Sequence, residues 1–149
     1  MMNNTLICLD LEGTLISNAI SQIPRPDLYA FLTKVAELGS LVLFTSVSPD
    51  RTKQIQQLLV AEHVVPAWFN DLQAIHPSGT KKPKSQAIEH APAASHYYLI
   101  DDQSQCIEAS ENDWWIPIEE YLPPYRSDDQ ELLRVAEFTQ QKLLREAKS

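Results

Sequence analysis

Three short apolar segments constrain the fold of this chain more than any other feature of its sequence. They cover residues 5–9, 41–44 and 97–100, and each is an almost unbroken run of apolar side chains. Strands that helices cover on both faces have this pattern, whereas strands with one face in water alternate apolar and polar residues. The three segments therefore predict the central strands of a parallel sheet.

Helical patterns lie between these strands. Residues 26–38 carry apolar side chains at helical spacing, with a proline near the first turn and Gly39 directly after the last turn, where glycine is a common stop signal. Ser48 is the expected N-cap of a second helix that continues through Leu59. A strand, a helix and a further strand separated by short connections are typical of a parallel sheet with crossover helices.

The remaining elements are less strongly patterned. They are a strand around residues 68–69, a short helix capped by Ser85 that ends before Pro92, a strand over residues 114–118, and a last helix reaching Leu144 that follows the capping-box sequence Ser127-Asp128-Asp129-Gln130. The expected fold class is therefore α/β, with a doubly wound, mainly parallel sheet of five or six strands. Since no repeat or linker interrupts the 149 residues, we expect one domain over residues 1–149.

The charge balance excludes broad classes of partner. Twenty acidic and 12 basic residues give a net charge of −8, which disfavours general binding to nucleic acid or to acidic membranes. The local exception is Lys81-Lys82-Pro83-Lys84, where three cations stand in four positions.

Several features favour the cytoplasm. Cys8 and Cys106 are too few for a disulfide framework and have no zinc-ligand spacing. Residues 1–4 lack the cationic start of a signal peptide, and no apolar stretch approaches the roughly 18 residues of a membrane span. The sequence predicts no oligomeric state.

Polar and acidic residues follow each of the three strong strands. Residues 10–14 read Asp-Leu-Glu-Gly-Thr, residues 45–46 read Thr-Ser, and residues 101–102 are both Asp. The carboxyl ends of parallel strands meet at one edge of the sheet, so four carboxylates and the hydroxyls should lie close together. Clustered carboxylates repel one another unless a cation neutralises them, and Mg²⁺ prefers hard oxygen ligands. With the cations of residues 81–84, the pattern predicts a site for Mg²⁺ and a phosphoryl group.

The order of these motifs resembles the haloacid dehalogenase-like (HAD) phosphohydrolases. The resemblance runs from Leu6 to Asp102: Asp-x-Glu-Gly-Thr, then strand-Thr-Ser, then Lys, then strand-Asp-Asp. Residues 25–32 (RPDLYAFL) and 128–133 (DDQELL) are similar to the CTD-phosphatase-like, or NLI-interacting factor, branch. The resemblance implies a HAD-like, Rossmann-type domain and a Mg²⁺-dependent phosphatase.

The resemblance also implies roles for the acidic residues. Asp10 would attack phosphorus and form an aspartyl-phosphate. Mg²⁺ would be held by Asp10, by the backbone carbonyl of Glu12 and by Asp102, with Asp101 as the supporting partner of these ligands. A group that follows the nucleophile by two residues, here Glu12, would serve as acid and base.

The resemblance assigns the phosphate-binding groups with two alternatives. Thr45, or Ser46 in its place, would donate a hydrogen bond to phosphoryl oxygens. A lysine would neutralise their charge. Lys82 fits the Lys-Pro form of the family motif, whereas Lys84 fits the spacing of the CTD-phosphatase branch.

Glu12 departs from the family, whose phosphatases usually carry Asp at this position. The additional methylene displaces the carboxylate, and a misplacement of about 1 Å can cost on the order of 10²-fold in rate. Two functions therefore remain: a phosphatase acting on a phosphomonoester, or a catalytically weak or inactive binding module. A receiver-like phosphoacceptor domain is excluded by motif order, because receivers carry the acidic pair at the first strand.

The motif spacing leaves no room for a cap domain. Asp10 and Thr45 are 35 positions apart, Thr45 and Lys82 are 37 apart, and predicted helices fill much of both intervals. An open site suits a large phosphorylated substrate, such as a phosphoprotein or a nucleic-acid end, although small phosphate esters also fit. Arg25 is interpreted as either a substrate contact or a solvated residue at a helix start.

Overall fold

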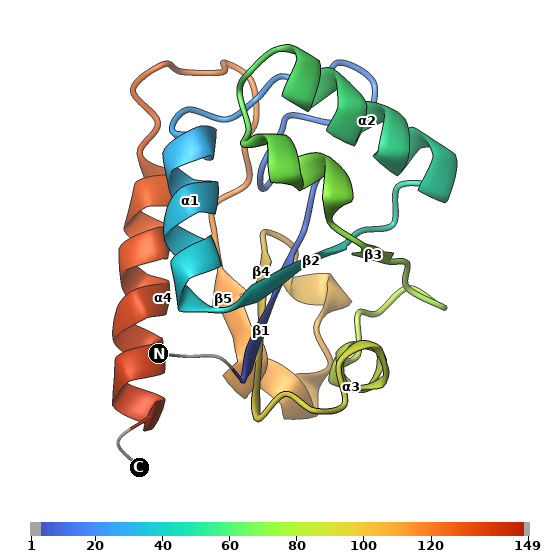
Figure 1. The fold of residues 1–149 in the computed structure, drawn as a ribbon, viewed down its shortest axis with the longest axis vertical. Helices are drawn as coiled ribbons and strands as arrows, with labels where there is room; N and C mark the ends of the chain where they lie inside the picture. The colour runs from blue at the N-terminus through green and yellow to red at the C-terminus, as the bar shows by residue number, and fades with distance from the viewer. Residues whose placement is uncertain (1–3, 148–149) are drawn as a thin grey trace.

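The computed structural model describes residues 4–147, which form one parallel sheet flanked by helices (Figure 1). The strands follow the order β3-β2-β1-β4-β5. Their bounds are Thr5–Leu9 (β1), Ser40–Phe44 (β2), Ala74–Ile75 (β3), His96–Asp101 (β4) and Trp115–Pro117 (β5). The fold class predicted from the sequence is confirmed, with every strand pair parallel. The structure does not describe residues 1–3 and 148–149, so the predicted limits of the domain, residues 1 and 149, lie outside the described residues. Most of residues 1–4, where no signal peptide is expected, also lies outside them.

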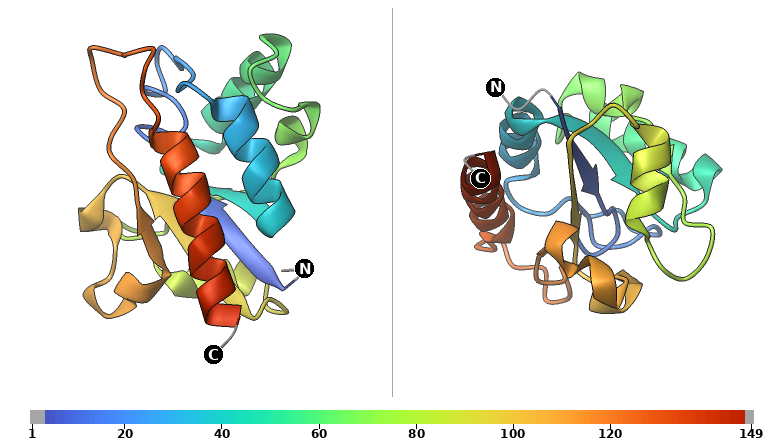
Figure 2. Two further views of the ribbon diagram at one scale, coloured as in Figure 1. Left: turned by 90° about the vertical axis from the view of Figure 1, so that its left-hand side faces the viewer. Right: turned by 90° about the horizontal axis from the view of Figure 1, so that it is seen from below.

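Helices cover both faces of this sheet. Their bounds are Leu28–Leu38 (α1), Pro49–Ala61 (α2), Lys84–His90 (α3) and Glu131–Ala147 (α4), with 3-10 turns at Ala67–Asp71, Ser104–Cys106 and Ala109–Trp114. Figure 2 shows α1 and α4 side by side on one face of the sheet. No helix in the described part of the chain combines the length and the apolar character needed to cross a membrane.

The alternation of side chains along β1 divides the interior into two layers. Ile7 and Leu9 belong to the core that α1, α2 and α4 cover, whereas Leu6 and Cys8 point into the core beneath α3 and Trp114. All four side chains are buried, because successive residues of a strand face opposite sides of a sheet and both sides are covered. This double burial explains the continuous apolar runs in the sequence.

The strand order places a topological switch point beside β1. The chain leaves β1 for β2 and β3 on one side, then returns to β4 and β5 on the other. Leu9 pairs with Leu43 of β2 and with Ile100 of β4, so the residues after these three strands emerge together. Ligands in open α/β sheets bind in the crevice at such a point.

The strand expected around residues 68–69 is wrong. Residues 67–71 form a 3-10 turn whose Phe69 is buried in the core, and β3 begins at Ala74. The side-chain amide of Gln56 donates hydrogen bonds to the carbonyl oxygens of Phe69 (2.7 Å) and Leu72 (3.1 Å). A partner on α2 thus satisfies backbone groups that the sequence interpretation assigned to a strand.

Two predicted helix caps are also wrong, because distant or later carboxylates do the capping. Lys84, not a residue after Ser85, begins α3, and its backbone N–H donates to Glu111 Oε1 at 3.0 Å. In α4, Asp129 Oδ1 accepts the N–H of Glu131 at 3.1 Å. Ser127 therefore lies before the helix start and does not cap it.

Gly39 ends α1, but not through the left-handed conformation that a glycine stop usually adopts. Its φ of −178° is extended. A Cβ at this position would lie 2.7 Å from the carbonyl oxygen of Thr5, which is a backbone atom and cannot turn aside. Glycine is needed here because the turn into β2 passes close to β1.

We expect Gly39→Ala to lower the free energy of unfolding by about 1–3 kcal/mol, the usual cost of overpacking a tight contact. Urea denaturation measures this difference. Gly79→Ala is the matched control, because a Cβ there meets nothing within 4 Å, and it should not destabilise the protein. Equal stabilities of the two variants would contradict the steric explanation.

Candidate active site

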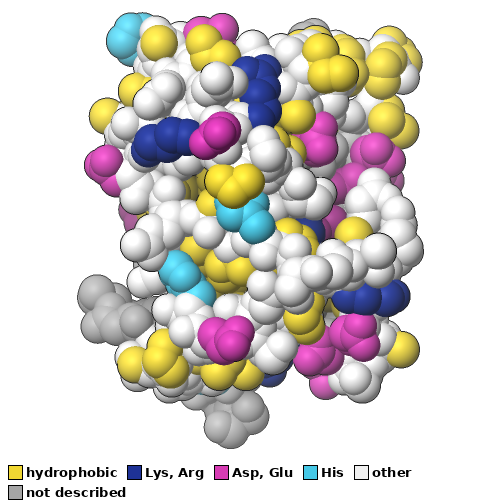
Figure 3. Space-filling model, turned by 90° about the vertical axis from the view of Figure 1, so that its right-hand side faces the viewer, with side chains coloured by type: hydrophobic (Ala, Val, Ile, Leu, Met, Phe, Trp, Pro, Cys, Tyr) yellow, Lys and Arg dark blue, Asp and Glu magenta, His cyan; other side chains and the backbone are white. Residues whose placement is uncertain are grey.

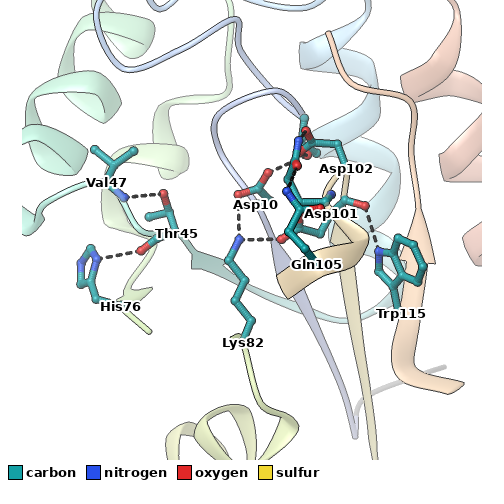
Figure 4. A network of polar contacts seen from close by, with 11 residues as sticks. Asp10, Thr45, Val47, His76, Lys82, Asp101, Asp102, Gln105 and Trp115 are labelled. Atoms are coloured by element: carbon teal, nitrogen blue, oxygen red, sulfur yellow. Dashed lines mark hydrogen bonds and ion pairs between the residues drawn. The ribbon is translucent and has the colours of Figure 1, made fainter. Parts of the chain in front are cut away.

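Three aspartates meet at the carboxyl edge of the sheet. Asp10 follows β1, Asp101 is the last residue of β4, and Asp102 comes next. One carboxylate oxygen from each lies within 4.8 Å of the others (Figure 4). The structure therefore brings together the acidic strand ends that the sequence placed at one edge.

The ammonium group of Lys82 lies between two of these carboxylates. Its Nζ is 2.8 Å from Asp10 Oδ1 and 2.5 Å from Asp101 Oδ2, and Figure 4 shows the side chain extending to both. The residue is buried, and its backbone N–H donates to the carbonyl of Cys106 at 2.8 Å. The side chain is thus fixed at its base and at its tip.

Burial and charge shift the pKa values of these groups. Burial raises the pKa of Asp10 well above its usual value and also raises that of Asp101, although Lys82 acts in the opposite direction on both. Burial disfavours the ammonium form of Lys82, but Asp10 and Asp101 outweigh this effect and raise its pKa. One ammonium is not enough charge for three neighbouring carboxylates.

The hydroxyl of Thr14 shows where a cation is needed. Its Oγ1 lies 2.9 Å from Asp10 Oδ2 and 3.0 Å from Asp102 Oδ1. A hydroxyl has one proton and can donate it to one of these carboxylates at a time. Because the donors are hard carboxylate oxygens held close together, the set fits a cation such as Mg²⁺.

Gly13 lets the loop after β1 approach Asp102. Its φ is +76°, a conformation that favours glycine, and a Cβ there would lie 2.5 Å from Asp102 Oδ2. The same oxygen accepts a hydrogen bond from Gln103 Nε2 at 2.5 Å. The glycine of the Asp-Leu-Glu-Gly-Thr motif therefore has a steric role at the site.

Thr45 and Ser46 follow β2 and line the same cavity, which has a volume of about 580 Å³. Thr45 Oγ1 accepts the N–H of Val47 at 3.1 Å, so the hydroxyl proton can be donated to a ligand. His76 Nδ1 donates to the backbone carbonyl of Thr45 at 3.0 Å, because a carbonyl oxygen can only accept. Ser46 is exposed.

The structure separates the two candidate lysines. Lys82 lines the cavity, whereas Lys84 is the first residue of α3 and is not among the residues that line it. Lys82, the lysine of the Lys-Pro sequence, is therefore the one that contacts the carboxylates.

Glu12 also lines the cavity, but its carboxylate bonds to the loop that follows. Oε2 accepts the backbone N–H of Ala19 at 2.5 Å. Arg51, in the first turn of α2, fixes this loop by donating to the carbonyl of Ala19 and to Gln22 Oε1, both at 2.7 Å. The loop is thus built around the longer side chain of glutamate.

Arg25 has neither of the roles considered for it. It is buried, and its guanidinium binds Asp129 through two hydrogen bonds of 3.1 Å. It also donates to the carbonyl of Thr14 at 3.2 Å. Arg25 ties the loop after β1 to the start of α4.

Sequence reasoning missed several residues that hold the site in place. Thr14 stands in the recognised motif, four residues after Asp10, so its position was available from the sequence. Gln103, Arg51 and His76 act through contacts that no local pattern signals. Trp115 is another such case, since its indole N–H donates to the carbonyl of Asp101 at 2.9 Å.

Lys82→Met should lower the free energy of unfolding by about 3–5 kcal/mol at pH 8, because it leaves buried carboxylates without a counter-charge. Because Lys82 lowers the pKa of both carboxyl groups, its removal would raise their folded-state pKa values further above the unfolded value of about 4. The variant therefore loses more stability than the wild type as pH rises above that value. The wild-type ammonium stays protonated well above pH 8. The deficit should therefore shrink between pH 8 and pH 5.

Urea denaturation in the presence of a chelator measures both effects. The exposed neighbour supplies a matched control, Lys81→Met, which should change stability by less than about 0.5 kcal/mol. A Lys82→Met deficit that does not change with pH would contradict the proposed pairing.

Comparison with known proteins agrees with this geometry. The chain matches the NLI interacting factor-like phosphatase family over residues 5–149. A comparison with curated protein sequences gives no match. Since the family match spans nearly the whole chain, the chain belongs to the NLI interacting factor-like phosphatases, in the CTD-phosphatase branch of the HAD-like proteins.

Proposed function

We propose that the protein is a Mg²⁺-dependent phosphomonoesterase that uses Asp10 as its nucleophile. The observation that carries this proposal is the buried ammonium of Lys82 between Asp10 and Asp101, with Asp102 beside them at the wall of a cavity. The family match supports phosphatase activity in general.

Asp10, Asp102 and the backbone carbonyl of Glu12 are the proposed ligands of Mg²⁺. Asp101 is completely buried, its Oδ2 binds the ammonium of Lys82, and its Oδ1 accepts the N–H of Gln103 at 2.9 Å. Asp102 is only partly buried and accepts hydrogen bonds from the uncharged side chains of Thr14 and Gln103. This supports a positioning role for Asp101. Bound Mg²⁺ would supply positive charge next to the phosphoryl oxygens.

The proposed reaction has two displacements at phosphorus. A carboxylate oxygen of Asp10 forms a bond to phosphorus, the bond to the leaving alkoxide breaks, and Glu12 gives this alkoxide a proton. A water molecule then gives its proton to Glu12 and attacks the aspartyl-phosphate, which releases phosphate and restores Asp10. Lys82 and Thr45 stabilise the negative charge of the phosphoryl group during both steps.

A second function, a binding module without efficient turnover, is favoured by one contact. The hydrogen bond from Ala19 to Glu12 occupies a carboxylate oxygen that would otherwise be available for proton transfer. The two functions differ in the release of phosphate.

Both cysteines are free thiols in the structure. Free thiols are typical of a reducing compartment, so we retain the cytoplasm as the proposed location.

The wild-type protein should release phosphate from an aryl phosphate only when Mg²⁺ is present. Asp10→Asn removes the nucleophile and should lower the rate by about 10³-fold or more. Phosphate release at steady state, with and without a chelator, measures this. Asp102→Asn should also weaken the increase in melting temperature that Mg²⁺ causes. No phosphate release by the wild type, together with tight binding of phosphate, would favour the binding module.

Glu12→Asp should lower turnover by about tenfold to 10²-fold, because the shorter side chain cannot keep its bond to Ala19 and still hold its position. Glu12→Gln keeps the length but cannot exchange a proton, so it should also be slow. The affinity for Mg²⁺ should change little in either variant, since the proposed ligand is the backbone carbonyl. A Glu12→Asp variant faster than the wild type would show that glutamate is a misplaced acid, as the sequence alone suggested.

A further inference from the structure

The cavity that holds the three aspartates has a strong excess of negative charge. Five carboxylates line it, those of Asp10, Glu12, Asp101, Asp102 and Glu120, together with the single ammonium of Lys82. A divalent cation would offset only part of this excess, and a phosphate dianion would increase it again. A substrate with a positive charge near its phosphate would therefore bind better than one with further negative charges.

Glu120 differs from the other four carboxylates because no protein group binds it. Asp10 and Asp101 bind Lys82, Asp102 accepts from Thr14 and Gln103, and Glu12 accepts from Ala19. Among the described residues, the exposed carboxylate of Glu120 has no hydrogen-bond or ion-pair partner. It is the carboxylate of the cavity that has no protein partner to compete with a ligand.

The backbone fixes Glu120 beside the loop that follows β1. The N–H of Tyr121 donates to the carbonyl of Gly13 at 2.8 Å. The Tyr121 ring is buried and packs against the Arg25 guanidinium, whose carbon lies 5.2 Å from the ring centre. These contacts hold the backbone of Glu120 at the cavity wall.

A second hollow begins on the other side of Glu120. Its volume is about 320 Å³, and Glu120 shares its lining with the apolar Leu122 and Pro124, with Tyr121, and with the charged groups of Arg126, Asp128 and Asp129. Two further carboxylates there are already paired, Asp128 with Arg126 at 2.8 Å and Asp129 with Arg25. An apolar wall next to an unpaired carboxylate fits a Lys or Arg side chain, whose alkyl stem packs on apolar surface while the charged end meets the carboxylate.

We propose that Glu120 selects phosphomonoesters that carry a cationic group next to the phosphate, and in particular phosphorylated protein segments with Lys or Arg beside the phosphorylated residue. This proposal rests on the proposed function, because the phosphate must occupy the cavity of Asp10. The phosphate enters that cavity, and the basic side chain enters the hollow of Leu122 and Pro124.

The same observations disfavour a nucleic-acid end as the substrate. Such an end carries additional phosphates, which the unpaired Glu120 would repel. Lys and Arg side chains are scattered among acidic and hydrophobic ones on the face that Figure 3 shows, so that face offers no concentrated positive field to a polyanion.

The test compares length-matched phosphoserine peptides that carry Arg, Gln or Glu beside the phosphoserine, on either side of it. With Mg²⁺ at low ionic strength, kcat/KM for the best Arg peptide should exceed that for its Gln counterpart by about three- to tenfold, and the Glu peptide should be slowest. The preference should decrease at high salt. Affinities of the same peptides for Asp10→Asn, measured by calorimetry, should follow the same order.

Glu120→Gln should abolish the preference for Arg over Gln. Glu119→Gln is the matched control, because this neighbouring carboxylate lines a different hollow, beside Glu131 and Arg134, and the preference should persist. Equal rates for the three peptides, a preference that survives Glu120→Gln, or faster turnover of a 5′-phosphorylated oligonucleotide would each overturn the proposal.

An aryl phosphate separates this proposal from the proposed function. Mg²⁺-dependent release of phosphate from the aryl ester, without any preference among the peptides, would refute the role of Glu120 and leave the phosphatase in place. If no compound is hydrolysed, the proposed function fails. The affinities of the peptides for the wild-type protein then decide whether Glu120 selects cationic ligands.

Discussion

The contact on which the site depends is the buried ammonium of Lys82 between Asp10 and Asp101. Parallel strands with acidic ends place carboxylates close together, and burial makes their charges costly. Lys82 offsets part of this cost and fixes the ends of β1 and β4 relative to each other. Lys82 leaves part of the negative charge of the carboxylates uncompensated. A further cation would neutralise that charge, so the site is able to bind a metal ion.

A second buried cation, outside the cavity, also joins two segments of the chain. Arg25 binds Asp129 and the carbonyl of Thr14, so it joins the loop after β1 to the segment before α4. That segment also presents Tyr121, whose N–H binds Gly13, and with it Glu120. The residues that resemble the CTD-phosphatase branch at positions 25–32 and 128–133 thus contribute a structural tie through Arg25 and Asp129.

The sequence predicted those features that depend on residues close together in the chain. Strands that are buried on both faces appear in the sequence as continuous apolar runs, so β1, β2 and β4 could be located. The geometry of a parallel sheet then predicted that Asp10, Thr45 and Asp102 lie at one edge. The prediction from the sequence failed where the local structure depends on a residue far away in the chain. Gln56 binds the carbonyl of Phe69 in the turn that was predicted as a strand, and β3, with two residues, is too short to carry a pattern.

The choice between Lys82 and Lys84 could not be made from the sequence for the same reason, since it depends on where the chain enters α3. The position of the Glu12 carboxylate is a further feature that the sequence could not predict. The sequence compares its length with that of aspartate in an unchanged loop, whereas the structure shows a loop held by Arg51 with the N–H of Ala19 at the end of the longer side chain. A substitution in a family motif therefore has to be judged together with the contacts around it. In this chain those contacts give the glutamate a fixed position, which a flexible loop would not.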